Sequence, residues 1–440
     1  MADGATPAAA EHTEPDWLKA RRQRAADAVG TLELPQHRGI PGWEFTDLSD
    51  LDLDAYPVAN GNADRAAIEG AERLWEPGET LARVEQVDGS PVGPLEVDPG
   101  ESDADDPSRD APARPVLMPL AAAAERYPDL IQAHFGTVVS GEDPFVARNE
   151  AGWSGGAFLY VPRGQRLEAP AQITAVQDAA GSALNWRTLI VLEEGAEAEV
   201  WEQYLSADTE VEALFNGVVE LHVGPNAHLR YLCGQSLSER SWVFGTQRAE
   251  VDRDGSLDWV ALGFGSARGK VRMETKLTGA GSSAKVTGAY AGHGRQHLDF
   301  DTTQEHAAPS TTSDLAFRGV LDGRATAVWR GMIRVDPGAQ QTDAFQESRN
   351  LLLSKRAHAD AIPGLEIEAN DVRCTHAAAV AQVDKDQLFY LMARGLGRED
   401  ATRLIIDGFM QELVERFAEG PVREALSHAL ERRLEEILGA

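Results

Sequence analysis

The sequence predicts a mainly β chain with α-helical ends, in which a long β core separates two helical regions. Short apolar runs bounded by Gly, Pro and Asn fill the middle of the chain. Helix-type patterns precede and follow this tract, and turn pairs within it recur at a roughly constant interval. The predicted divisions are an N-terminal helical or irregular region (1–140), a β core (141–383) and a C-terminal helical region (384–440).

The composition indicates an acidic protein of the cytoplasm. The formal net charge is −30, from 71 acidic and 41 basic residues, of which only six are lysines. Such a field repels nucleic acid and anionic lipid, so we expect neither as a partner. High salt screens self-repulsion, and an acidic, lysine-poor chain therefore suggests a salt-rich cytoplasm. The alternative is an acidic interaction surface. Two cysteines exclude a disulfide framework, and neither a membrane-spanning apolar run nor a signal-peptide pattern is visible.

The N-terminal region combines helices with an acidic linker. Thr13 is placed as an N-cap for a helix that continues through residues 17–29 and stops near Gly30. Residues 97–114 are acidic, Pro-rich and nearly free of large apolar side chains, which predicts a linker or a surface insertion. Residues 117–136 have the pattern of one or two helices.

The β core repeats one theme, in which a turn pair is followed by an alternating strand. The first four turns recur at intervals of about 26 to 31 residues. Two or more strands per period, with no helix between them, suit a coil of stacked β rungs, and a β-sandwich is the alternative. Predicted strands include the apolar runs 145–146, 157–161 and 189–192, and the turn-plus-strand units are 193–200, 224–232, 253–262, 280–290 and 321–335.

The C-terminal region begins with a helix-start pattern at Asp384, and Gly395 is placed to stop that helix. A second helix, over about 399–417, carries an apolar stripe wider than a two-helix contact needs. The stripe either packs in the core of a small bundle or forms a face that docks a partner. The candidate docking residues are Leu404, Ile405, Phe409 and Leu413.

Cys374 and His376 form a C-x-H motif. On a strand, residues i and i+2 point to the same face, so the thiol and the imidazole would share one side. Both groups are suitable ligands for iron or zinc, but one pair cannot complete a site without ligands from another chain. The alternative is a buried cysteine beside a surface histidine, and Cys233 is interpreted as a core residue.

Other motifs favour a scaffold over an enzyme. His293, His297 and His306 are another possible metal cluster, but they lie in turn-rich sequence without acidic or cysteine ligands to complete it, so a structural or solvent-facing role is expected. The segment GFGSARGK lacks the first glycine and the final hydroxyl of a phosphate-binding loop, so this chain is not expected to bind ATP. Neither a nucleophile elbow nor a zinc-protease motif is found.

Four segments of the sequence resemble the SufB/SufD family of iron–sulfur cluster assembly proteins. Residues 322–354 and 363–395, with the C-T-H motif, carry most of the resemblance, and residues 306–323 and 145–164 also fit it. The sequence is closer to SufD than to SufB, because Ala377 rather than a glutamate follows His376. The absence of any cysteine between Cys233 and Cys374 points the same way.

The resemblance implies a right-handed parallel β-helix with N- and C-terminal helical domains. It also implies a complex with a SufB-like paralogue and a SufC-like ABC ATPase, the latter docked on the C-terminal helices, or a homodimer when SufB is absent. The resemblance also makes His376 and Cys374 candidate ligands for a transient iron–sulfur cluster at the subunit interface. Alternatives are a SufB-like scaffold that holds the cluster by itself and a β-helix carbohydrate-active enzyme.

Overall fold

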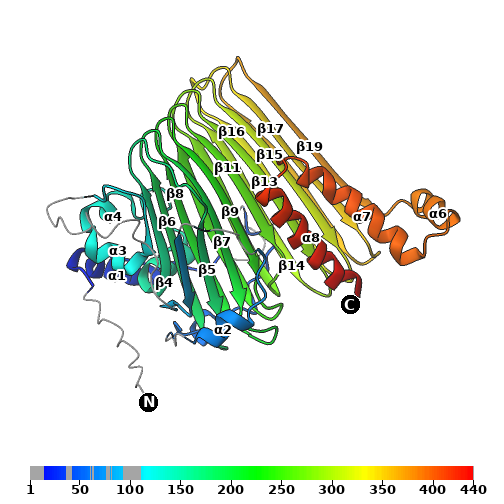
Figure 1. The fold of residues 1–440 in the computed structure, drawn as a ribbon, viewed down its shortest axis with the longest axis horizontal. Helices are drawn as coiled ribbons and strands as arrows, with labels where there is room; N and C mark the ends of the chain where they lie inside the picture. Colours follow the sequence, from blue (N-terminus) through cyan, green and yellow to red (C-terminus); the bar gives the residue numbers. More distant parts are fainter. Residues whose placement is uncertain are drawn as a thin grey trace.

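The centre of the molecule is a parallel β-helix of about eight turns (Figure 1). The computed structural model describes residues 14–35, 42–59, 61, 64–75, 80, 82–92 and 111–439. Each turn of the β-helix contributes one strand to each of two sheets, and successive strands within a sheet pair in parallel. The predicted coil of stacked β rungs is therefore confirmed. A β-sandwich is excluded, because sandwich sheets are antiparallel.

Two sheets contain the strands of the described residues. Their only antiparallel pairs among these residues are β3 with β4 and β1 with β2, both at the N-terminal end. The first sheet contains β3 (Val116–Pro119), β4 (Gly155–Val161), β6 (Ala183–Leu192), β8 (Leu214–Val223), β10 (Trp242–Val251), β12 (Arg268–Leu277), β14 (His297–His306), β16 (Thr326–Val335) and β18 (His358–Ile367). The second sheet contains β1 (Ala82–Val87), β2 (Ser90–Pro91), β5 (Ala171–Gln177), β7 (Glu197–Ser206), β9 (His228–Ser236), β11 (Ser256–Gly263), β13 (Ser283–Gly292), β15 (Thr312–Leu321), β17 (Asp343–Leu352) and β19 (Arg373–Gln382).

Left-handed turn residues set the period of the β-helix. Gly195, Asn226, Asp254 and Gly281 have φ values of 69°, 53°, 55° and 76°, and each precedes a strand of the second sheet. Glycine, asparagine and aspartate are the residues that enter this region most readily. The recurring turn pairs in the sequence therefore correspond to one corner of the β-helix, repeated once per turn.

Large apolar side chains fill the interior. Alternate residues of each strand point inward, and stacking of the turns removes them from water. Five aromatic residues are among the largest completely buried side chains: Trp186, Tyr231, Trp259, Tyr290 and Trp329.

The N-terminal helices are α1 (Asp16–Val29), α2 (Arg65–Gly70), α3 (Leu120–Arg126), α4 (Pro128–His134) and α5 (Pro144–Gly152), with a 3-10 turn at Leu53–Ala55. The predicted helix ending at Gly30 is confirmed. The predicted helical stretch 117–136 contains the two helices α3 and α4, but its residues 117–119 belong to strand β3 instead. Pro15 is the N-cap of α1, and Thr13 lies outside the described residues. Of the predicted acidic linker 97–114, only residues 111–114 are described.

The predicted strand at 145–146 is wrong, because these residues belong to α5. The Asp143 side chain accepts hydrogen bonds from the backbone N–H groups of Phe145 and Val146, at 2.8 and 3.0 Å. Pro144 follows at the first helical position, where its missing N–H costs nothing. The preference of Asp143 and Pro144 for a helix start is therefore stronger than the strand preference of the short apolar run at 145–146. The strands predicted at 157–161 and 189–192 are confirmed in β4 and β6.

The C-terminal helices are α6 (Lys385–Ala393), α7 (Arg398–Val414) and α8 (Pro421–Gly439). The Asp384 side chain caps α6, and Gly395, with φ of 99°, follows its end, as predicted. Helices α7 and α8 pack on the outer face of the second sheet, whereas α6 projects away from the β-helix (Figure 1). None of the helices in the described ranges has the length and apolar character needed to cross a membrane.

Candidate functional site

The C-terminal end of the β-helix is open. β18 is the last strand of the first sheet and β19 the last of the second, so each leaves one edge without a strand partner among the described residues. Inward-facing side chains of this last turn have no further turn stacked on them. Leu365, Ile367 and Val380 are consequently 38%, 41% and 43% exposed, although their counterparts in earlier turns are buried.

Cys374 and His376 lie on β19 in this last turn. They pair in register with Ala344 and Gln346 of β17, whose side chains are buried in the interior. Cys374 is half-buried beside the cluster that contains Ala344, and His376 is exposed. The two side chains thus share the inward face of β19 at the open end, and their role as ligands remains a prediction.

The surroundings of Cys374 disfavour the thiolate form of its side chain. Partial burial, followed by the nearby Asp343 carboxylate, raises the pKa of Cys374 above its usual range. No group of three or more His, Cys, Asp or Glu side chains in the described part of the chain has the arrangement of a metal site. Cys374 and His376 could therefore supply only part of a ligand set.

Cys233 is a core residue, as predicted, and it lies in the middle of the β-helix. Burial raises the pKa of its thiol to about 12, and it belongs to an interior polar cluster that sequence reasoning missed. Glu202 is completely buried there and accepts hydrogen bonds from Trp186 Nε1 at 2.7 Å and Tyr231 OH at 2.6 Å. Carboxylates are abundant in this sequence, so nothing local distinguishes Glu202 from those on the surface.

The three histidines considered together are separated by the fold. His306 is buried, which lowers its pKa to about 4, and its ring contacts the hydroxyls of Thr311 and Ser313 at 2.8 and 2.9 Å. His297 contacts Thr326 on the outer face of the first sheet, and His293 pairs with Glu239 at 2.7 Å. These contacts fit the expected structural roles.

The predicted docking stripe divides between the core and the surface. Leu413 is 1% exposed and packs in the core formed by α7, α8 and the second sheet, so it cannot contact a partner in this position. Ile405 and Phe409 are partly buried against the same core, and Leu404 is 51% exposed. The core-packing interpretation thus describes one side of α7, and the docking interpretation can apply only to the other.

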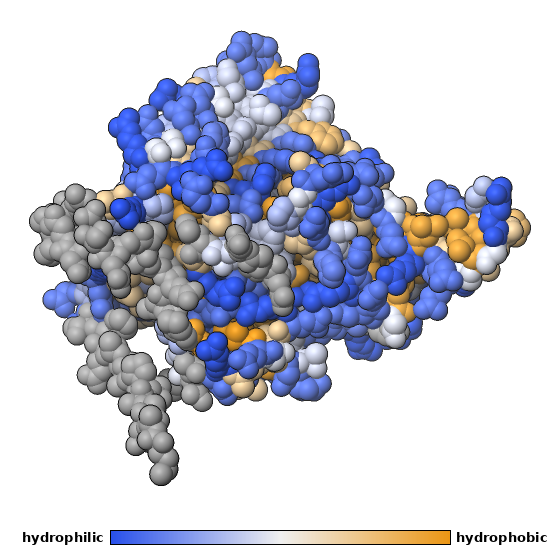
Figure 2. Space-filling view, in the orientation of Figure 1, coloured by the Kyte–Doolittle hydropathy of each residue, from blue (hydrophilic) through white to orange (hydrophobic). Residues whose placement is uncertain are grey.

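Helix α6 carries the larger exposed apolar surface, which the prediction missed. Phe389 is 73% exposed, and Tyr390, Met392 and Leu396 are also exposed. Figure 2 shows apolar side chains gathered on the projecting C-terminal segment. Its sequence pattern marked a helix, but only the projection of α6 from the β-helix leaves these side chains uncovered.

Two family models together match most of the chain. Residues 174–409 match the SufBD core domain of the SUF system for FeS cluster assembly, and residues 102–173 match the SufBD N-terminal region. The chain belongs to the SufBD family. The family resemblance inferred from the C-T-H region is therefore confirmed.

Individual SufBD relatives align over almost the whole chain. The iron–sulfur cluster assembly protein SufD of Bacillus subtilis is 30% identical over 431 residues, covering 96% of this chain and 95% of the relative. A SufBD family iron–sulfur cluster assembly protein of Synechocystis is 27% identical over 429 residues, covering 94% and 92%. One from Staphylococcus saprophyticus is 28% identical over 404 residues, covering 90% and 85%.

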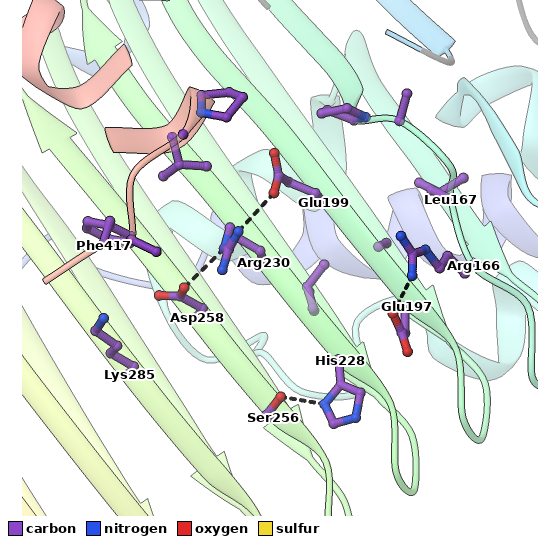
Figure 3. Close-up of a pocket in the computed structure, with 18 of the residues that line it drawn as sticks. Arg166, Leu167, Glu197, Glu199, His228, Arg230, Ser256, Asp258, Lys285 and Phe417 are labelled. Carbon is purple, nitrogen blue, oxygen red and sulfur yellow. Dashed lines mark hydrogen bonds and ion pairs between the residues drawn. The ribbon is translucent and has the colours of Figure 1, made fainter. Parts of the chain in front are cut away.

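A charged groove joins the C-terminal helices of this SufBD protein to its β-helix. It has a volume of about 610 Å³ and lies between the second sheet and the loop after α7 (Figure 3). Arg230 bridges Glu199 and Asp258, each at 3.1 Å. Lys285 Nζ donates to the backbone carbonyl of Arg416, just beyond α7, at 2.5 Å. The C-terminal end of α7 is therefore anchored to the sheet, whereas α6, which precedes α7, projects away from the β-helix (Figure 1).

Proposed function

We propose that this SufBD protein acts as a SufD-type subunit of a SUF scaffold complex that supports de novo iron–sulfur cluster assembly. It would pair with a SufB-like paralogue through the open end and dock a SufC-like ABC ATPase through its C-terminal helices. The observation that carries the proposal is the open last turn, where Cys374 and His376 share an inward face with exposed apolar residues. The chain itself would neither catalyse a reaction nor bind ATP.

The open end has the properties of a surface that pairs with another β-helix. The free edges of β18 and β19 present backbone N–H and C=O groups that a partner strand could satisfy. Leu365, Ile367 and Val380 would lose their exposed apolar surface in the same contact. A partner built on the same fold, either the SufB-like paralogue or a second copy of this chain, has an end of matching shape.

Iron and sulfide would be cargo at this junction rather than a resident cofactor. Imidazole and thiolate are suitable iron ligands, and the partner would provide the rest of the set. The raised pKa of Cys374 disfavours its thiolate in the free subunit, so His376 is the better first ligand. A neutral imidazole binds without adding charge, which suits a cluster that must later leave.

The ATPase would dock on the exposed face of α6 and on Leu404 of α7. Phe389 and Tyr390 offer large side chains of the type that dominate protein interfaces. A movement of α6 would reach the second sheet through α7, whose end is tied down by Lys285. ATP hydrolysis in the partner could in this way reshape the open end without ATP binding to this chain.

The two alternative functions are less well supported. A SufB-like scaffold acting alone would need several thiolates at one place, but Cys233 is buried in the middle of the β-helix and Cys374 lies at its end. A carbohydrate-active enzyme would need free acids on an exposed face. In the groove of Figure 3, Glu199 and Asp258 are instead both paired with Arg230.

The test uses the complex purified at high salt from cells that express the tagged chain. We expect co-purification of a SufB-like paralogue and an ABC ATPase, and a cluster assembly rate that falls at least about tenfold in His376→Ala. His293→Ala is the control, because that histidine lies on a loop away from the open end. Assembly at the wild-type rate in His376→Ala would reject the ligand role, and recovery of the chain alone would reject the complex.

A further inference from the structure

Gln346 lies directly beside His376 in the β-helix. The two residues pair in register on β17 and β19, which are neighbouring parallel strands. Strands in a sheet are about 4.8 Å apart, so side chains at paired positions on one face are within reach of each other. Gln346 is completely buried at the floor of the open end, and His376 is exposed above it.

The side-chain amide of Gln346 is held from one side only. Its Nε2 donates to the carbonyl oxygens of Gly331 and Gly364, at 3.3 and 3.1 Å. A Cβ at Gly331 would approach Gln346 Oε1 within 2.5 Å, so a glycine is required for this amide position. The Oε1 atom is buried and accepts no hydrogen bond. A buried, unused acceptor of this kind is unfavourable, because the oxygen has lost water without gaining a donor.

An imidazole N–H is a suitable donor for this oxygen. A neutral histidine carries a proton on one ring nitrogen and a lone pair on the other, and a hydrogen bond to the first leaves the second ready to bind a metal. The ring of His376 makes no hydrogen bond within the described residues. An amide acceptor orients the ring without the negative charge that a carboxylate would add.

We propose that Gln346 is a positioning residue for His376. When a partner covers the open end, Gln346 Oε1 accepts a hydrogen bond from one ring N–H of His376, and the other ring nitrogen faces the cluster. This inference rests on the proposed function of His376 as a ligand. In this role, the neutral acceptor of Gln346 orients the ligand and leaves it readily exchangeable.

The test measures Co²⁺ binding to the assembled complex by absorption spectroscopy, together with the rate of Co²⁺ release to a chelator. Gln346→Leu should weaken Co²⁺ binding about tenfold, the lower end of what loss of an orienting partner costs. Gln346→Glu keeps the shape and an acceptor oxygen but loses the Nε2 donor to Gly331 and Gly364. Its negative charge should hold the His376 ring more strongly, so this variant should release Co²⁺ more slowly than wild type. Ser348→Ala, at the next inward position of β17, should match wild type.

Different results separate the two hypotheses. If His376→Ala leaves Co²⁺ binding unchanged, the proposed ligand role fails. If His376→Ala abolishes binding but both Gln346 variants match wild type in affinity and release rate, the ligand role stands and the positioning role is overturned. If Gln346→Leu does not fold, the release rate of the isosteric Gln346→Glu decides, and an unchanged rate overturns the inference.

Discussion

Leu315 and Leu365 both point toward the axis of the β-helix, yet they differ completely in exposure. Leu315, on β15, is 0% exposed, whereas Leu365, on β18, is 38% exposed. Both residues occupy inward positions of a strand, and the difference is that further turns stack over β15, whereas no turn of the described residues stacks over β18. The last turn of a repeating fold has the same apolar inward positions as the earlier turns, but no further turn buries them. The end of the repeat is therefore an apolar surface that a partner can cover.

The two cysteines repeat this comparison in chemical terms. Cys233 lies among polar groups that are sealed inside the β-helix, with a thiol pKa of about 12, and it is inert at neutral pH. Cys374 occupies an inward position too, but the open end leaves it half-buried. Partial burial and, after it, the nearby Asp343 carboxylate raise the pKa of Cys374. A substitution at Asp343, or a partner that covers the open end, would therefore change this pKa.

The largest expected effect comes from truncating the two leucines. Leu315→Ala leaves a cavity in a packed interior and should lower the free energy of unfolding by about 2–5 kcal/mol. Leu365→Ala should lower it by less than about 1 kcal/mol in the isolated chain, since its side chain already contacts water. Urea denaturation of the isolated protein measures both. Equal losses would show that the last turn is covered in solution.

A charge at the open end tests the surface itself. Val380→Glu should weaken binding of the SufB-like partner more than about tenfold, because a carboxylate would be desolvated in the contact. Val58→Glu is the matched control, since Val58 and Val380 are each 43% exposed and Val58 lies far from β19, beside the start of β6. Titration of each variant with the partner gives the affinities. Equal affinities for the two variants would argue against pairing through the open end.

The interior carboxyl should make stability depend on pH. Burial raises the pKa of Glu202, so the native state keeps a proton that the unfolded chain releases. Stability must then fall as pH rises above the unfolded pKa, by up to about 1.4 kcal/mol per pH unit for one proton. Glu202→Gln should flatten this fall at pH values above the unfolded pKa in urea denaturation. An unchanged slope would assign the pH dependence to other groups.

The smallest expected effect concerns the reactivity of Cys374. Removing the nearby charge in Asp343→Asn should lower the thiol pKa and speed alkylation at pH 8 by a few fold, because the thiolate is the nucleophile. Cys233 should stay unmodified in the folded protein and serves as the internal reference. Mass spectrometry of each cysteine peptide measures the rates. A slower reaction in Asp343→Asn would contradict the assigned charge effect.

Local sequence patterns were sufficient to predict much of this structure. The recurring turns predicted stacked β rungs, Asp384 and Gly395 marked the ends of α6, and the C-x-H spacing predicted a shared face for Cys374 and His376. These features depend on backbone preferences and on the two-residue period of a strand, which are properties of neighbouring residues. The strand predicted at 145–146 failed for the same reason, since a cap two residues earlier was the stronger local preference.

Burial and neighbours in space depended on the tertiary structure alone. Segments one turn away, or across a helix contact, decide which turn is left open and place Gln346 beside His376. They also bury Glu202 in the interior and cover Leu413 on the inner side of α7. The sequence determined which side of each strand and helix is apolar. Only the stacking of turns and the docking of α7 and α8 decided which apolar sides are covered, because water is excluded by distant segments and not by adjacent ones.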